Sequence, residues 1–198
     1  IYVTQVGGQD ELVFDGGSFA VNADGELAVV APDFEEGCFE LWVERTVRGV
    51  AIAQGVAAAA LSDVAAVWQA LVLGVRDYVE KNGFPGVVLG LSGGIDSAVT
   101  LAVAVDALGA DRVQAVMMPF KYTADMSVED AGEQASVMGV EYDVISIEPI
   151  YEAFMSGLTD QFDGLSVDTT EENLQARCRG VLLMSISNND ATWTLYNC

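Results

Sequence analysis

The stretch VVLGLSGGIDS at residues 87–97 joins an apolar run to a turn made of small residues and one acid. The apolar, β-branched beginning predicts a buried strand over Val87–Leu91, and the pattern after the turn predicts a helix over Ala98–Leu108. A strand, a glycine-rich turn and a helix in this order can hold an anion on backbone N–H groups. A Walker-type loop would also carry a lysine for the phosphates, and this loop has none.

The chain around this unit alternates strands and helices. A helix is predicted to begin at the N-cap Ser62 and to end at Asn82-Gly83. The further strands are predicted at Val113–Met118 and Tyr142–Ile147, and the further helices at Ser127–Met138, about 149–157 and 170–187. Alternation of this kind predicts an α/β fold with a parallel sheet and right-handed crossovers. Ligands of such sheets bind at the carboxyl ends of the strands, so the expected binding loops are Ser92–Ser97, Pro119–Asp125 and the loop after Ile147.

The first 50 residues follow a different pattern. Turn signals separate short strand-like runs, as in a β meander or the edge of a larger sheet. The runs are Tyr2–Gln5, Leu12–Phe14, Ser18–Val21, Leu27–Ala31 and Cys38–Val43. Gln9, Asp10 and Glu11 fit a polar turn, Cys38 a buried structural thiol, and Trp42 and Trp68 core positions. Residues 46–62 are small and apolar and predict a linker.

Composition excludes several functions. The net charge is −22, from 8 basic and 30 acidic residues, which argues against a nucleic-acid partner. The chain has no histidine, so it cannot carry Ser–His or Cys–His catalysis. Its three cysteines show neither metal spacing nor an even number for disulfides, which favours a cytoplasmic location. Neither a signal peptide nor an apolar run of transmembrane length is evident, so no membrane partner is expected; the first residue is not Met, which suggests a start within a longer protein.

The loop itself suggests a specific chemistry. Ser92, Gly93 and Gly94 let the backbone curl around an anion, which the amino end of the next helix also attracts. Asp96 would repel that anion unless a cation lay between them, so Mg²⁺ bridging Asp96 and a polyphosphate is the economical interpretation. Ser97 could donate its hydroxyl to a phosphate oxygen. The structural alternative is a plain β–α turn in which Asp96 is a helix-start acid.

These residues also carry a family resemblance. SGGIDS is similar to the pyrophosphate loop of the N-type ATP pyrophosphatases, which form adenylates from ATP. The longer stretches at 77–119 (DYVEKNGFPGVVLGLSGGIDSAVTLAVAVDALGADRVQAVMMP) and 169–188 (TTEENLQARCRGVLLMSISN) resemble NAD⁺ synthetases. VGGQDELVFDGGSF at 6–19 resembles the end of the nitrilase-like glutaminase domain of glutamine-dependent members.

The resemblance implies a division of the chain. Residues 1–48 would end a nitrilase-like α/β glutaminase domain, and 49–61 would be a linker. Residues 62–198 would form an adenine nucleotide alpha-hydrolase-like (Rossmann-like) synthetase domain, incomplete at its carboxyl end. The glutaminase nucleophile, a cysteine in this family, would lie upstream of this chain, and family members pair as homodimers through the synthetase domain.

The implied activity is ATP-dependent amidation of nicotinic acid adenine dinucleotide to NAD⁺ through an adenylate, with ammonia supplied from glutamine. Asp96 would be the magnesium ligand, and Asn173 and Arg177 would bind the deamido dinucleotide. The positions matching the ATP loop are Gly90, Leu91, Ser92, Gly93, Gly94, Ile95, Asp96 and Ser97.

Three basic residues have two interpretations each. Arg177 and Arg179 are close together in a chain with few basic residues, which suggests recognition of phosphate or carboxylate, but a surface pair on an acidic protein has the same spacing. Lys121 lies in Pro119–Ser127, which matches a mobile loop over the nucleotide in the family. It is a candidate phosphate contact or a solvated lysine.

The resemblance ends after residue 189. The family pattern continues into a strand with a TGN-type segment and a second magnesium-binding acid, whereas residues 190–198 read DATWTLYNC. The sequence therefore leaves three hypotheses open: part of a glutamine-dependent enzyme, a catalytically incomplete ATP-binding module, or another ATP pyrophosphatase such as a GMP- or asparagine-forming amidotransferase.

Overall fold

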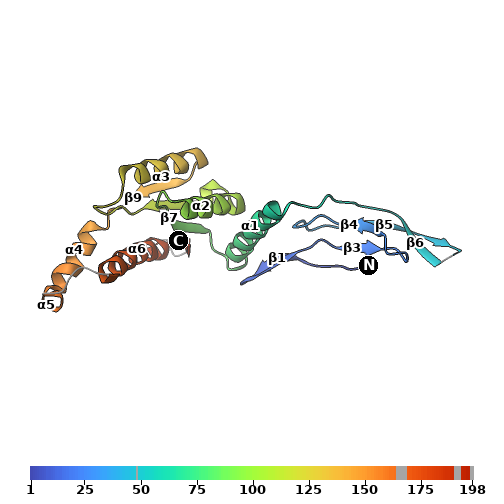
Figure 1. Ribbon diagram of the computed structural model, residues 1–198, viewed down its shortest axis with the longest axis horizontal. Helices are drawn as coiled ribbons and strands as arrows, with labels where there is room; N and C mark the ends of the chain where they lie inside the picture. Colours follow the sequence, from blue (N-terminus) through green and yellow to red (C-terminus); the bar gives the residue numbers. More distant parts are fainter. Residues whose placement is uncertain (48, 164–168, 190–192, 197–198) are drawn as a thin grey trace. The chain divides into compact units, whose positions relative to one another are not determined.

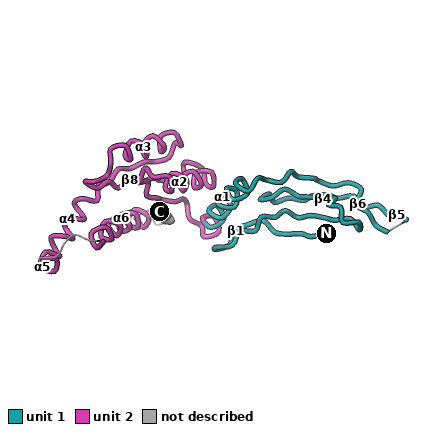
Figure 2. The backbone as a smooth tube through the Cα atoms, viewed as in Figure 1, with its two compact units in different colours: residues 1–78 teal, residues 79–198 magenta. Residues whose placement is uncertain are grey.

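The computed structural model describes residues 1–47, 49–163, 169–189 and 193–196, and it divides the chain into two compact units. Unit 1 covers Ile1–Tyr78 and unit 2 covers Val79–Cys198 (Figure 2). The helix α1 (Asp63–Lys81) runs across this boundary. It begins as the sequence predicts, because the Ala65 N–H donates to Ser62 Oγ over 3.3 Å.

Unit 1 is built from three antiparallel ribbons of two strands each. They pair β1 (Val6–Gln9) with β2 (Leu12–Asp15), β3 (Phe19–Val21) with β4 (Leu27–Val30), and β5 (Leu41–Thr46) with β6 (Gly49–Gly55). Ala20 of β3, Val29 of β4 and the adjacent Ala31 are buried. The predicted short strands are present, but they form three separate ribbons and not one meander, and the first strand is Val6–Gln9 instead of Tyr2–Gln5.

Glycines explain that misplaced strand. Residues 2–5 form only an isolated bridge, Tyr2 to Phe19, while Gly7 and Gly8 lie inside β1. The Gly8 N–H donates to Asp77 Oδ2 over 2.7 Å, and a Cβ at Gly8 would lie 3.2 Å from the Gly74 Cα of α1. The glycine therefore allows α1 to pack closely on β1. The turn begins only after Gln9, at Asp10, which has a φ of 52°.

Three further predictions for unit 1 are wrong. Residues 49–55 are not a linker but the strand β6, which pairs with β5 from Leu41↔Gly55 to Thr46↔Gly49. Trp42 is 62% exposed rather than a core residue, and Cys38 is exposed. Trp42 is exposed because a two-stranded ribbon leaves most of its side chains uncovered, whatever their hydrophobicity, and Cys38 lies before β5, outside the ribbon. Trp68 on α1 is half-buried.

Unit 2 is a parallel sheet with helices, which confirms the predicted α/β class (Figure 1). The strand order is β10-β7-β8-β9, and every pair is parallel. The strands are β7 (Gly86–Gly90), β8 (Val113–Met117), β9 (Glu141–Val144) and β10 (Trp193–Tyr196). The helices are α2 (Ile95–Leu108), η1 (Ala110–Arg112), α3 (Asp125–Met138), α4 (Glu148–Gly157), α5 (Thr159–Phe162) and α6 (Thr169–Asn189). Within the described part of the chain, no helix is long and apolar enough to cross a membrane.

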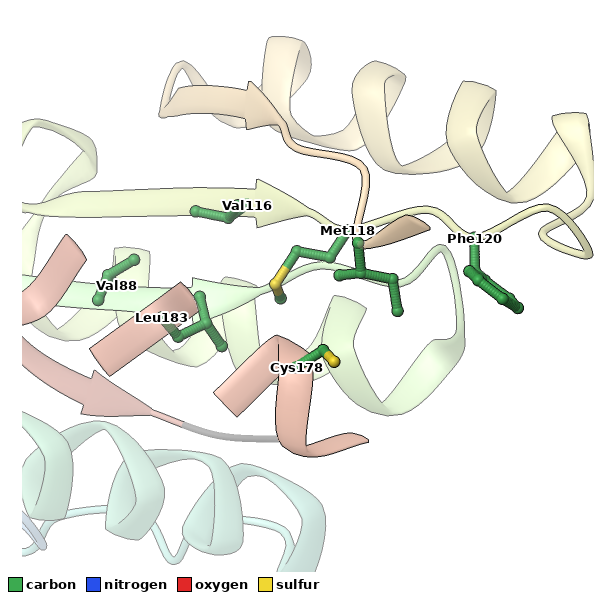
Figure 3. Close-up of a cluster of buried hydrophobic side chains, with 7 residues drawn as sticks. Val88, Val116, Met118, Phe120, Cys178 and Leu183 are labelled. Atoms are coloured by element: carbon green, nitrogen blue, oxygen red, sulfur yellow. The ribbon is translucent and has the colours of Figure 1, made fainter. Parts of the chain in front are cut away.

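The core of unit 2 forms around β7 and β8. Alternation along each strand directs Val88 and Val116 toward α6, where they meet Cys178 and Leu183 (Figure 3). Met118, Phe120 and Ile147 complete this buried cluster. The cluster fixes α6 against the carboxyl ends of β7 and β8, so the chain after each strand opens beside α6.

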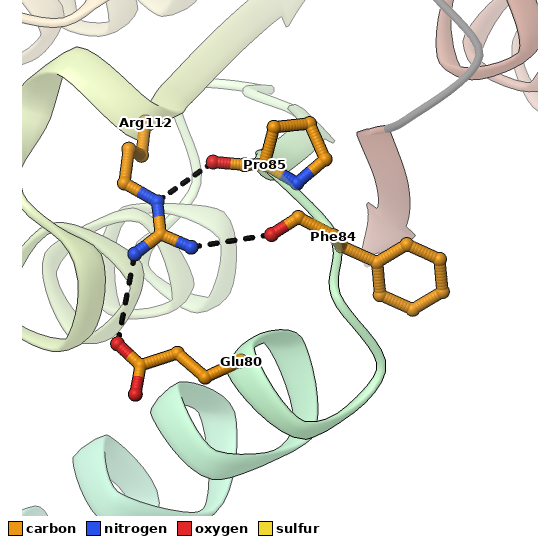
Figure 4. A network of polar contacts seen from close by, with 4 residues as sticks. All are labelled: Glu80, Phe84, Pro85 and Arg112. Atoms are coloured by element: carbon orange, nitrogen blue, oxygen red, sulfur yellow. Dashed lines mark hydrogen bonds and ion pairs between the residues drawn. The ribbon is translucent and has the colours of Figure 1, made fainter.

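A network around Arg112 fixes the beginning of β7 (Figure 4). Its Nε donates to Pro85 O over 2.7 Å and its Nη2 donates to Phe84 O over 3.2 Å. Its Nη1 lies 3.6 Å from Glu80 Oε1 at the end of α1. The planar guanidinium of Arg112, just before β8, therefore binds both the end of α1 and residues 84–85, which connect α1 to β7.

Candidate functional site

The loop that follows β7 is shaped by one close backbone contact. Leu91 is buried and its N–H donates to Val116 O over 2.9 Å, after which the chain turns away from the sheet into α2. Gly93 has φ of +77°, and a Cβ there would lie 2.7 Å from the Cα of Ser127 and 2.9 Å from its carbonyl carbon. Only glycine fits both the conformation and the approach to α3.

The two serines of the loop hydrogen-bond to each other and to its backbone. The Ser97 Oγ lies 3.0 Å from Ser92 Oγ, accepts from the Ser92 N–H over 3.1 Å and donates to Gly94 O over 2.9 Å. The Gly94 N–H donates to Ser92 Oγ over 3.3 Å. Ser97 is 2% exposed. The hydroxyl that the sequence assigns to a phosphate is thus engaged inside the loop.

The first turn of α2 presents unused donors. Gly94 is its N-cap and offers no side chain, and the N–H groups of Ile95, Asp96 and Ser97 have no acceptor among the described residues. These groups lie at the positive end of the helix dipole. The Asp96 carboxylate is exposed and has no hydrogen-bond or ion-pair partner within the described ranges. The turn can therefore accept an anion, and Asp96 is available to a cation.

A cavity of about 350 Å³ opens beside this loop at the carboxyl edge of the sheet. Its lining comes from β7 and the loop after it, β8 and the residues after it, and α6. The lining residues are Gly90, Leu91, Ser92, Met117, Met118, Thr123, Arg179 and Leu183. Sequence reasoning identified the first three and Arg179. Thr123 lies within the expected binding loop Pro119–Asp125. The sequence did not single out Met117, Met118 or Leu183, although Met118 ends a predicted strand, which is the position where ligands of parallel sheets bind.

Arg179 is the cation of this cavity. Its Nε donates to Met118 O over 3.3 Å, and no carboxylate of the described residues lies within ion-pair distance of it. Burial lowers the pKa of the Arg179 guanidinium, although an arginine stays charged at neutral pH. A half-buried cation without a carboxylate, in a chain of charge −22, is placed to bind an incoming anion.

The other candidate side chains lie outside this cavity's lining. Arg177 and Asn173 are exposed on α6. Arg177 is only two positions from Arg179, but residues two positions apart on a helix face different directions. Lys121 is exposed, with its Nζ 5.4 Å from the ring centre of Phe120 and 5.1 Å from that of Tyr122. Of the basic candidates, the structure therefore brings only Arg179 to the loop.

The loop between β8 and α3 is held at its base. Phe120 is buried and packs edge-on against Tyr151, with ring centres 4.9 Å apart, and its N–H donates to Thr123 Oγ1 over 2.9 Å. The helix α3 then begins at Asp125, not at Ser127, and its N-cap Ala124 offers no side-chain cap. The helix predicted over Ser127–Met138 therefore begins two residues earlier than expected, and Ser127 lies in its first turn, against Gly93.

The structure describes only part of the tail that follows α6. The positions 190–192 and 197–198 are not described, whereas residues 193–196 form β10, paired with β7 from Trp193↔Gly86 to Tyr196↔Leu89. The sequence did not predict this strand. The further strand expected of the family thus has a counterpart in backbone topology.

Known proteins share this sequence and this geometry. The family model described as NAD synthase matches residues 67–195. The glutamine-dependent NAD(+) synthetase of Acinetobacter baylyi is 53% identical over 188 residues, covering 95% of this chain and 34% of that protein. The chain thus spans about a third of the length of the curated relatives that it matches first.

Solved structures agree. A glutamine-dependent NAD⁺ synthetase from Acinetobacter baumannii, in complex with adenosine diphosphate, superposes with a TM-score of 0.92 at 53% identity; the match covers 97% of this chain and 36% of that one. An NH₃-dependent NAD synthetase from Campylobacter jejuni gives a TM-score of 0.59 at 28% identity over 68% of this chain and 56% of that one.

Proposed function

Since the chain belongs to the NAD synthase family, we propose that it is the ATP-pyrophosphatase part of a glutamine-dependent NAD⁺ synthetase. It would contribute to the amidation of nicotinic acid adenine dinucleotide to NAD⁺. The observation that carries the proposal is the cavity that Arg179 and Ser92 line together, beside the loop that leads into the free amides of α2. The relatives that share this segment bear the name of that activity, and one of them was solved with adenosine diphosphate.

The chemistry has two steps. A carboxylate oxygen of the deamido dinucleotide attacks the α-phosphorus of ATP, and the α–β bridging bond breaks to release pyrophosphate. Ammonia then attacks the adenylated carboxyl carbon; AMP leaves, and the lost proton passes to solvent. The first nucleophile is already an anion, so the absence of histidine from the chain is no obstacle.

The chain's own residues would bind and orient the phosphates. The N–H groups of Ile95, Asp96 and Ser97 would donate to the β- and γ-phosphate oxygens, where charge gathers as pyrophosphate leaves. Arg179 would add a charged donor from the facing helix. The side chains of Met118 and Leu183 give the cavity an apolar wall suited to a base.

Asp96 fits a magnesium ligand. Mg²⁺ typically binds proteins through one or two carboxylates and takes its remaining ligands from phosphates and water. Asp96 is exposed and unpaired, and the described residues hold no cluster of three acidic, cysteine or histidine side chains that would form a dedicated cage. Asp96 would hold the ion, whose charge would help neutralise the leaving pyrophosphate.

The remaining assignments rest on the family resemblance and on position. Asn173 and Arg177 would contact the deamido dinucleotide from the exposed side of α6, and Lys121 would reach a phosphate only by leaving its two aromatic rings. The segment before α1, including the whole β5–β6 ribbon, would belong to the glutaminase domain that supplies ammonia. A homodimer through the synthetase domain is inferred from the family resemblance alone.

The proposal is tested through nucleotide binding and turnover. Titration calorimetry with ATP and Mg²⁺ should show binding to the chain, and pyrophosphate release should require the deamido dinucleotide rather than another carboxyl substrate. Asp96→Asn should weaken Mg²⁺-dependent ATP binding at least about tenfold without changing the unfolding midpoint. The matched control is Asp111→Asn, which removes an exposed acid before the amino end of β8. Wild-type affinity in the Asp96 variant would refute the assignment.

A further inference from the structure

The Ser97 hydroxyl has no hydrogen-bonding capacity left for a ligand. A hydroxyl offers one proton and two acceptor sites. Donation to Gly94 O uses the proton, so in the short contact with Ser92 Oγ the proton belongs to Ser92. The Ser92 N–H takes the second acceptor site of Ser97. This assignment satisfies every contact of the network and leaves the buried oxygen complete.

Ser92 completes the network from the other side. Its Oγ accepts from the Gly94 N–H over 3.3 Å while it donates to Ser97. The hydrogen bonds thus join residues 92, 94 and 97 across the turn, so the beginning of the loop is fixed to the first turn of α2. Gly93, which lies between Ser92 and Gly94, has no side chain that could fix the path. The two hydroxyls therefore determine where the free amides of the turn lie.

We propose that the Ser97 hydroxyl positions the anion site, acting through Ser92 and Gly94, and makes no contact with a phosphate itself. The inference rests on the proposed function for the identity of the anion, but the hydrogen-bond network exists without any ligand. Preformed donors give up little freedom when an anion binds, so a loop already fixed in shape binds more tightly than a mobile one.

The first test needs no nucleotide. In Ser97→Ala, the Ser92 amide loses its acceptor, so its hydrogen exchange measured by NMR on the full chain should be at least about tenfold faster. Exchange of the β7 and β8 core amides should stay unchanged. Thr100→Ala is the matched control, because this hydroxyl lies on the same helix and donates only to Asp96 O. Unchanged Ser92 exchange in Ser97→Ala would overturn the proposal.

The second test uses ATP with Mg²⁺ in a double-mutant cycle of Ser92→Ala and Ser97→Ala. Ser97→Ala should weaken ATP binding about tenfold in the wild-type background and clearly less in the Ser92 variant, since the two hydroxyls share one hydrogen bond. Independent effects that multiply to about 100-fold would instead indicate separate phosphate contacts and refute the positioning role. If the wild-type chain does not bind ATP, the proposed function fails, whereas the exchange experiment still decides the role of Ser97.

Discussion

Replacement of Gly93 by alanine tests the contact that shapes the phosphate loop. The residue has φ of +77°, which costs an L-residue about 1–2 kcal/mol. The added methyl group would also lie 2.7 Å from the Cα of Ser127 and 2.9 Å from its carbonyl carbon. These are main-chain atoms, which cannot swing aside as the end of a side chain can, and overpacking of this kind costs about 1–3 kcal/mol. We therefore expect Gly93→Ala to lose about 2–5 kcal/mol of unfolding free energy.

Two other glycines separate the contributions. Gly139, the C-cap of α3, has φ of 71°, but an added methyl group would have no other atom within 4 Å, so Gly139→Ala should show only the cost of the left-handed backbone, about 1–2 kcal/mol. Gly94 has an extended backbone, with φ of −90°, and its methyl group would meet only the side-chain oxygen of Ser92 at 3.3 Å. Gly94→Ala should therefore change stability by about 1 kcal/mol or less.

Native-state hydrogen exchange of the β7 and β8 amides is the appropriate assay, because it reports on unit 2 alone. ATP affinity, measured on the same variants, should fall most in Gly93→Ala, since the loop must move away from α3 to admit the methyl group. If Gly93→Ala is no less stable than Gly139→Ala, the backbone of Ser127 does not restrain the loop and the reasoning is refuted.

Three further changes address other parts of unit 2. Arg112→Ala should cost about 1–3 kcal/mol in urea unfolding, and Arg112→Lys should recover only part of it, because an ammonium cannot fork to two carbonyls; full recovery by lysine would contradict this. Burial raises the pKa of the Cys178 thiol, so the stability that the buried neutral thiol contributes is complete below about pH 8.5 and is lost as the pH rises further. Cys38, which is exposed, should be alkylated in the native protein long before Cys178. Equal labelling rates by mass spectrometry would disprove the burial. Gly90→Ala would place a methyl group 3.1 Å from the flexible end of Met118 inside the cavity, so calorimetry should show ATP binding weakened about tenfold with little loss of stability, and unchanged affinity would exclude this cavity as the nucleotide site.

Prediction from sequence succeeded where local patterns have local causes. The buried runs of β7 and β8, the Ser62 cap and the stop of α1 before Gly83 were all readable, because a strand buried on both faces must be apolar and a helix end needs a cap. Prediction failed for Gly7 and Gly8, because glycines are typical of turns but here lie within a strand packed against α1. It also failed for residues 49–55, whose pairing partner lies in β5. A strand's partner is a non-local fact that no window of residues contains.

The candidate site divides in the same way. Residues 87–97 by themselves determined a strand, an anion loop and a helix start, since glycine, serine and a helix N-terminus suffice to specify that geometry. Only the tertiary structure decided which residues surround the loop. It selected Arg179 over Arg177 because α6 turns one of them toward β8, it buried the Ser97 hydroxyl within the loop, and it placed the backbone of α3 against Gly93. Each of these outcomes depends on distances between segments far apart in the chain, and packing alone sets those distances.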